Sequence, residues 1–178
     1  MLLTMALCAA TSLSADTREE AEMRRLHKEV IVQAPLRDVW NAWTTNEGLR
    51  FISQESNVEL RLGGPYEWFL ELPPDEHGSR GGEGARVLAF LPREMLAFTW
   101  RFPPVVPELR LTGAETQVVV RFTDRGDGTV LVRLDAIGWQ EGEAWESGYE
   151  YFDQAWAIVL ERLKHELELR TSSRTERR

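Results

Sequence analysis

The hydrophobic pattern of the chain is most regular between Trp145 and Arg170. Large apolar residues recur there at steps of three or four, with charged residues between them, so they form one stripe on an α-helix. The stripe consists of Trp145, Tyr149, Phe152, Trp156, Val159, Leu160, Leu163 and Leu167. Its first half is aromatic and its second half is aliphatic. We expect the second half to be core and the first half to face a cavity or its mouth; the alternative is that the whole stripe is core.

The part of the chain before this helix is dominated by strand patterns. Alternating or β-branched runs predict strands at residues 28–33, 57–62, 66–72, 84–91, 95–101, 117–123 and 129–136. Gly63-Gly64 predicts a two-residue hairpin between the second and third of these. Two short helices are expected after the first strand, over 35–43 with Pro35 at its first position and over 47–52 with Asn46 as its cap.

The segment 102–113 is predicted to be a loop, because it contains three prolines, but it is unusually apolar. It is a candidate gate to a cavity, or a surface through which a protein partner binds. The order of elements is therefore one strand, two short helices, six strands and one long helix. Strands followed by a long amphipathic helix predict an α+β fold, with a curved antiparallel sheet wrapped around that helix.

Composition narrows the possible partners. The 178 residues carry a net charge of −8. This argues against a nucleic-acid partner, which requires a basic face, and against electrostatic docking on an anionic membrane. Seven tryptophans, spread over several predicted elements, fit one large aromatic interior.

The first 15 residues are apolar or small and uncharged, and charge begins at Asp16. The run is too short to span a bilayer, so it predicts a signal peptide ending at Ala15 and a periplasmic or secreted protein. The alternative is translation from Met23 and a cytoplasmic location. Cys8, the only cysteine, lies in this run. The chain then divides into the signal peptide 1–15, a lead-in 16–27, one domain over 28–170 and a disordered tail 171–178.

Several stretches carry a family resemblance: EVIVQAPLRDVWNAWTTNEGLRFI at 29–52, VELRLGGPYEW at 58–68, GEGARVLAFLPREMLAFTWRFP at 82–103 and GWQEGEAWESGYEYFDQAWAIVLERLKHELE at 138–168. With these stretches the chain resembles the SRPBCC (START-like) helix-grip superfamily, and within it the activator-of-heat-shock-ATPase-homologue-like group. The resemblance implies the helix-grip fold and binding of lipids, polyketides or other apolar molecules, and a few members resemble cyclases or hydrolases. An exported leader departs from this mostly cytoplasmic group.

The sequence contains no strong catalytic or metal-binding motif. His27, His77 and His165 lack ligand spacing, so we expect no metal and no cofactor. Glu150 and Tyr149 are weak catalytic candidates, since a buried carboxylate could act as a general base. The more ordinary interpretation is that acids here favour the start of the long helix.

We expect the protein to bind a small apolar molecule between the sheet and the long helix, because ligand sites are largely apolar with few polar groups. The predicted ligand-binding residues are Trp43, Phe51, Tyr66, Trp68, Trp100, Trp145, Tyr149, Phe152 and Trp156. The alternatives are an enzyme, such as a cyclase or hydrolase acting on an apolar substrate, and a co-chaperone-like module that binds a protein through 102–113.

Overall fold

The computed structural model describes residues 24–70, 78 and 80–175. The proposed signal peptide, most of the lead-in and His77 lie outside the described residues. The elements are β1 (Leu26–Val32), α1 (Leu36–Thr44), the 3₁₀ helix η1 (Gly48–Phe51), β2 (Glu55–Val58), β3 (Tyr66–Phe69), β4 (Val87–Leu91), β5 (Met95–Arg101), α2 (Pro107–Leu111), β6 (Glu115–Asp124), β7 (Val130–Ile137) and α3 (Glu143–Thr175).

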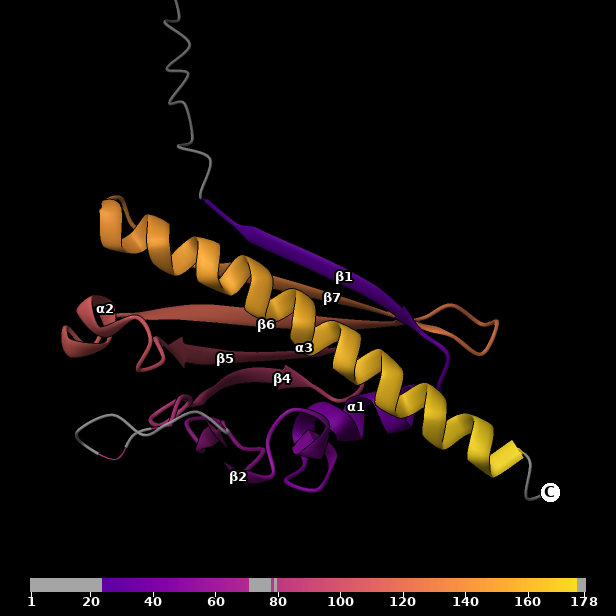
Figure 1. Ribbon diagram of the computed structural model, residues 1–178. Helices are drawn as coiled ribbons and strands as arrows, with labels where there is room; N and C mark the ends of the chain where they lie inside the picture. Colours follow the sequence, from indigo (N-terminus) through magenta and orange to yellow (C-terminus); the bar gives the residue numbers. More distant parts are fainter. Residues whose placement is uncertain (1–23, 71–77, 79, 176–178) are drawn as a thin grey trace, which may run out of the picture.

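The main sheet is antiparallel and has five strands in the order β1-β7-β6-β5-β4. β2 and β3 form a separate antiparallel pair. A bridge between Pro65 and Arg86 links this pair to the chain just before β4. The long helix α3 crosses one face of the main sheet (Figure 1). The α+β helix-grip arrangement predicted from the sequence is therefore confirmed.

The core lies between α3 and the sheet, and alternation along the strands builds it. On β6, Val118, Val120 and Phe122 are buried while their neighbours are more exposed. From α3, the residues that complete the core are Trp145, Phe152, Trp156, Val159, Leu160, Leu163 and Leu167. Their helical spacing places them on the face turned toward the strands.

The two short helices follow β1 as expected, but the cap differs. The Asn46 side-chain oxygen accepts a hydrogen bond from the Val58 backbone N–H at 2.8 Å, so it fixes β2 instead of capping η1. The Thr45 hydroxyl oxygen accepts the Gly48 N–H in its place, at 2.9 Å. Thr45, two residues before Glu47, which flanks η1, thus supplies the hydrogen-bond acceptor for the first backbone N–H of the helix.

The predicted hairpin is confirmed, because β2 and β3 pair antiparallel, but residues 59–65 connect them and the two-residue turn at Gly63-Gly64 is wrong. β2 ends at Val58, and the backbone of the two glycines pairs instead with Val87: the Gly63 N–H donates to the Val87 carbonyl, and the Val87 N–H donates to the Gly64 carbonyl, each at 2.9 Å. Leu62, in the predicted strand 57–62, lies outside β2 and is 68% exposed. The two glycines therefore join the small sheet to the large one.

The segment 102–113 is partly helical, because Pro107 begins the short helix α2. Phe102, Val106 and Leu109 are buried, whereas Val105 and Leu111 are exposed. Gly148 of α3 makes this packing possible: a Cβ built there would lie 2.7 Å from Cε1 of Phe102 and 3.0 Å from Cδ1 of Leu109. Part of the predicted loop is therefore core.

The long helix extends beyond the predicted 145–170 at both ends. Residues 171–175, assigned above to a disordered tail, are helical. The hydroxyls of Thr171, Ser172 and Ser173 each donate to the carbonyl four residues earlier, and Arg174 pairs with Asp38 at 3.2 Å. The polar end of the helix thus bonds to its own carbonyls and contacts Asp38 of α1.

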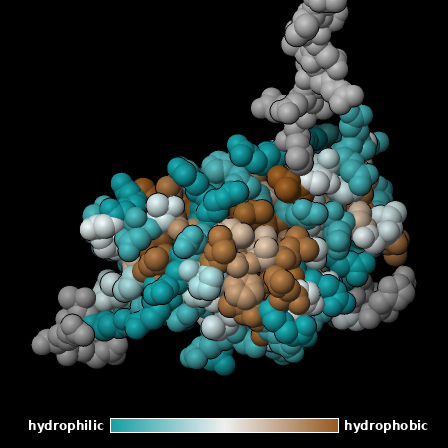
Figure 2. All heavy atoms as spheres, turned by 180° about the vertical axis from the view of Figure 1, so that it is seen from behind, coloured by the Kyte–Doolittle hydropathy of each residue, from teal (hydrophilic) through white to brown (hydrophobic). Residues whose placement is uncertain are grey.

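The face of the sheet away from α3 also carries apolar side chains, which gather near its centre (Figure 2). Leu88 and Leu91 of β4 are 42% and 53% exposed. Leu91 pairs with Met95 across the β4–β5 hairpin, next to the pairing of Phe90 with buried Leu96. The alternation of side chains places Leu91 and Met95 on the outer face.

Candidate functional site

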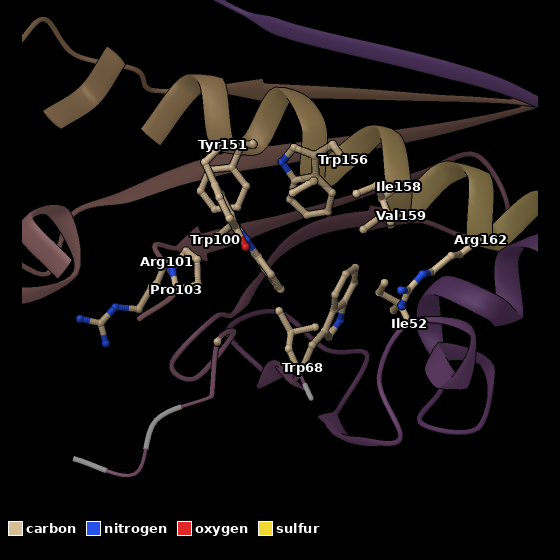
Figure 3. A pocket seen from close by; sticks show the side chains of 14 residues that line it. Ile52, Trp68, Trp100, Arg101, Pro103, Tyr151, Trp156, Ile158, Val159 and Arg162 are labelled. Carbon is tan, nitrogen blue, oxygen red and sulfur yellow. The ribbon is translucent and has the colours of Figure 1, made fainter. Parts of the chain in front are cut away.

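A cavity of about 340 Å³ lies between the middle of α3 and the ends of β3 and β5 (Figure 3). This volume is within the usual range for small-molecule sites. The described residues that line it are Ile52, Trp68, Leu70, Gly81, Trp100, Arg101, Pro103, Tyr151, Phe152, Ala155, Trp156, Ile158, Val159 and Arg162. Most of these side chains are apolar or aromatic, so the cavity favours an apolar occupant.

Three tryptophans form the deep wall. Trp68 and Trp100 approach with ring centroids 4.7 Å apart, and Trp156 of α3 lies 5.4 Å from Trp100 and 6.0 Å from Trp68. All three are at most 4% exposed. β3 and β5 supply the first two at inward strand positions, and α3 supplies the third. Edge and tilted ring contacts of this kind are favourable and hold the wall in one arrangement.

The helix side of the cavity comes from residues that share one face of α3. Phe152, Ala155, Trp156 and Val159 follow one another at steps of three, one and three residues. Phe152 stacks on Trp156 with an interplanar angle of 22°. Ala155 is small, so the space in front of its methyl group stays open. This gap in an otherwise bulky stripe contributes to the cavity.

Polar groups at the cavity are few. Tyr151 is half-buried beside Phe152, and burial raises the pKa of its hydroxyl, so it is protonated at neutral pH. Arg162 lies at the open side, where Ile158 is 52% exposed. The indole N–H of Trp156 is buried and has no hydrogen-bond acceptor among the described residues. The cavity therefore offers a ligand apolar contacts and stacking on aromatic rings, a positive charge from Arg162, and the titratable hydroxyl of Tyr151.

A polar cluster supports one edge of the cavity next to Gly81. The Glu83 carboxylate accepts hydrogen bonds from the backbone N–H groups of Arg80 and Gly81, and from the Arg110 guanidinium at 3.3 Å. Partial burial raises the pKa of Glu83, but these N–H groups and the Arg110 charge outweigh it and hold the pKa below its ordinary value. Arg110 also donates to the Phe102 carbonyl at 2.7 Å, so the cluster ties this edge to α2.

The structure brings four of the nine predicted ligand-binding residues to the cavity: Trp68, Trp100, Phe152 and Trp156. Trp43, Phe51 and Tyr66 lie behind this wall, where Trp43 packs on Trp68 and Phe51, and the Tyr66 hydroxyl donates to the Trp43 carbonyl at 2.7 Å. Burial raises the pKa of Tyr66 well above its ordinary value. These three residues support the wall from outside the cavity.

The first turns of α3 pack away from the cavity, contrary to expectation. Trp145 contacts the rings of Phe102 and Trp139. Tyr149 is half-buried, with the Arg24 guanidinium 3.9 Å from its ring centroid and its hydroxyl donating to the Arg25 carbonyl at 3.3 Å. The cavity lies instead along the middle of the helix, because α2 and Phe102 fill the space beside its beginning.

The two weak catalytic candidates therefore stand outside the cavity. Glu150 is exposed, on a different face of α3 from Phe152 and Trp156. Tyr149 faces the start of β1, where its hydroxyl is occupied by the Arg25 carbonyl. Neither position gives the desolvation that would turn an acid into a general base.

The cavity is also lined by Tyr151, Ala155, Val159 and Arg162, which are not among the ligand-binding residues predicted from the sequence. Three of them were detectable, because Ala155, Val159 and Arg162 follow Phe152 at steps of three, four and three on the same helix face. Ala155 is small and Arg162 is charged, so neither belongs to the pattern of large apolar residues that predicts the stripe. Leu70 and Pro103 come from chain segments whose approach only the tertiary fold determines.

In the described part of the chain, no helix combines the length and apolarity needed to cross a bilayer. The same residues include no group of three histidine, cysteine, aspartate or glutamate side chains placed to hold a metal ion.

The sequence of the chain also matches a known family. Residues 33–168 match the family described as activator of Hsp90 ATPase homolog 1-like protein, which covers most of the chain. The chain belongs to this family. The expected resemblance is thereby confirmed.

Solved structures show the same fold at low sequence identity. Protein MLL2253 from Mesorhizobium loti is 18% identical and gives a TM-score of 0.63, with 80% of this chain and 95% of that chain covered. Protein NE0264 from Nitrosomonas europaea is also 18% identical, with a TM-score of 0.61 and coverage of 86% and 99%. CalU16 from Micromonospora echinospora is 20% identical, with a TM-score of 0.56 and coverage of 80% and 73%. A comparison with curated proteins finds no match.

Proposed function

We propose that this protein binds a small apolar molecule, without transforming it, in the cavity between α3 and the ends of β3 and β5. The observation that carries the proposal is the cavity of about 340 Å³ walled by Trp68, Trp100, Phe152 and Trp156. An apolar pocket with few polar groups is the usual form of a small-molecule site.

The positions of the acids support binding over catalysis. Glu150 is exposed, and the Glu83 carboxylate is occupied by N–H groups with its pKa held low. Among the described residues that line the cavity, Tyr151 carries the one titratable hydroxyl, and its raised pKa keeps it protonated at neutral pH, where it is a poor base. We therefore favour a carrier or sensor of apolar molecules over a cyclase or hydrolase.

We also propose that the protein acts in the periplasm or outside the cell. The support is the apolar, uncharged run over residues 1–15, which has the length of a signal peptide. A carrier is useful in such a compartment, because apolar molecules are poorly soluble in the water that separates membranes.

Filling the cavity tests the binding proposal. The Ala155→Trp substitution places a large ring in the open space, and Gln154→Trp places the same ring on the exposed face of α3 as a control. The probe is the neutral dye N-phenyl-1-naphthylamine, whose fluorescence rises in apolar surroundings. We expect the wild-type protein and the control to bind the dye and the Ala155→Trp variant to bind at least about tenfold more weakly, since its site is occupied. Equal binding by Ala155→Trp, or no binding by the wild type, would contradict the proposal.

A further inference from the structure

We propose that the ligand of this cavity is an amphipathic acid whose anionic group binds Arg162 while its apolar body lies against the tryptophan wall. The anionic group is a carboxylate, a sulfonate or a phosphate ester. This inference rests on the proposed function and adds the chemical class of the ligand.

The charged residues that line the cavity are opposite in sign to the net charge of the chain. The chain carries a net charge of −8. Among the described residues that line the cavity, however, the charged side chains are Arg101 and Arg162. A neutral apolar ligand needs no cation at its site. A local excess of positive charge in an acidic protein favours an anionic ligand at this position over other parts of the surface.

The two arginines are placed differently, and only one faces the cavity. The Arg101 guanidinium lies against the backbone of Gly84 and Gly113, where a built Cβ would be 3.1 Å and 3.5 Å from its terminal nitrogens. Figure 3 shows this head group pointing away from the other lining side chains. The Arg162 side chain runs from α3 toward Ile52, across the open side of the cavity (Figure 3).

Arg162 is also available for a ligand. It makes no hydrogen bond or ion pair with the part of the chain that the structure describes. Glu166, one helical turn later and a natural partner at that spacing, is paired instead with Arg170 at 2.8 Å. Arg162 therefore keeps its five N–H donors for a group that enters the cavity mouth.

The arrangement suits an acid with a long apolar body. The deep wall is dry and aromatic, so it binds the apolar part of a ligand. The charge is at the rim, where Ile158 is 52% exposed, so an anionic group there stays partly hydrated and avoids most of the cost of burying a charge. A guanidinium can bind a carboxylate or phosphate through two parallel hydrogen bonds.

The test compares decanoate with decan-1-ol, which share a similar chain and differ in charge. Each displaces N-phenyl-1-naphthylamine from the wild type, from Arg162→Gln, from Arg162→Lys and from Arg125→Gln, a control in the exposed β6–β7 turn. The quantity measured is the ratio of the dissociation constant of decan-1-ol to that of decanoate. We expect Arg162→Gln to lower this ratio about three- to tenfold, as for a solvent-accessible charge pair, and expect higher salt to lower it in the wild type. Arg162→Lys keeps most of the ratio, because it keeps the charge, and Arg125→Gln leaves it unchanged.

The two proposals fail in different ways. If the dye binds and Ala155→Trp blocks it, but the ratio is the same in Arg162→Gln as in the wild type, the site binds apolar molecules and the assignment of Arg162 is overturned. An equal loss in Arg125→Gln also overturns it, because the effect would then come from net charge. If the dye does not bind at all, the proposed function fails and this inference fails with it.

Discussion

Replacing Gly148 with alanine tests the packing that decides where on α3 the cavity lies. Gly148 sits in the second turn of α3, and a Cβ there would be 2.7 Å from Cε1 of Phe102 and 3.0 Å from Cδ1 of Leu109. Ordinary contacts of this kind are about 3.5–4.0 Å. The Phe102 ring must therefore move by several tenths of an ångström.

The ring has little room to move. Phe102 is fully buried, and its ring centroid lies 5.4 to 6.1 Å from those of Trp139, Trp145 and Phe152. Overpacking a core of this kind costs about 1–3 kcal/mol. Alanine gains about 1 kcal/mol over glycine in a helix. The cost of overpacking exceeds the gain in helix propensity, so we expect Gly148→Ala to lower the free energy of unfolding by roughly 1 kcal/mol.

Urea unfolding, followed by circular dichroism, measures this change. Ser147→Ala is the matched control, because Ser147 is exposed and the substitution changes only helix propensity; we expect it to raise stability by a few tenths of a kcal/mol. Combining Gly148→Ala with Phe102→Leu removes the contacted atom, so the added cost of Gly148→Ala should shrink in that background. A gain in stability of about 0.5 kcal/mol or more for Gly148→Ala alone would refute the reasoning, since it would mean that propensity outweighs the contact.

Two further predictions concern the edge of the cavity and the start of the chain. Glu83→Gln should lower the melting temperature most at pH values above the ordinary carboxyl pKa of 4.5. There the ionised Glu83, whose pKa is lowered in the folded protein, stabilises the fold. This contribution is lost as the pH falls through the lowered pKa. Melting curves from pH 3 to pH 7 should show that the wild type is more stable than Glu83→Gln by about 1 kcal/mol at pH 7 and by less in acid. Glu94→Gln, at an exposed position, is the control. A difference between wild type and Glu83→Gln that does not change with pH would contradict the assignment. Expression of the full chain in a bacterium should yield exported protein beginning at Asp16 by mass spectrometry, and Leu7→Arg, which interrupts the apolar run, should retain it inside the cell. A cytoplasmic product that keeps Met1 or starts at Met23 would argue against export.

The sequence by itself determined the fold to a large extent. One buried face of the sheet is specified by the alternation at Val118, Val120 and Phe122. One buried face of the long helix is specified by the spacing from Phe152 to Leu167, and these two apolar faces must pack on each other. Local patterns of this kind are read directly from the chain, because the period of the backbone sets them.

What the tertiary structure decided is which aromatic residues surround empty space. Trp43, Trp68 and Trp145 look alike in the sequence, yet only Trp68 lines the cavity, because Trp43 is covered by Trp68 and Trp145 by Phe102. The cavity depends on Ala155, a small residue between larger ones, and on β3 and β5 ending opposite it. Volume left between elements depends on every side chain around it at once, so no local pattern in the sequence reports it.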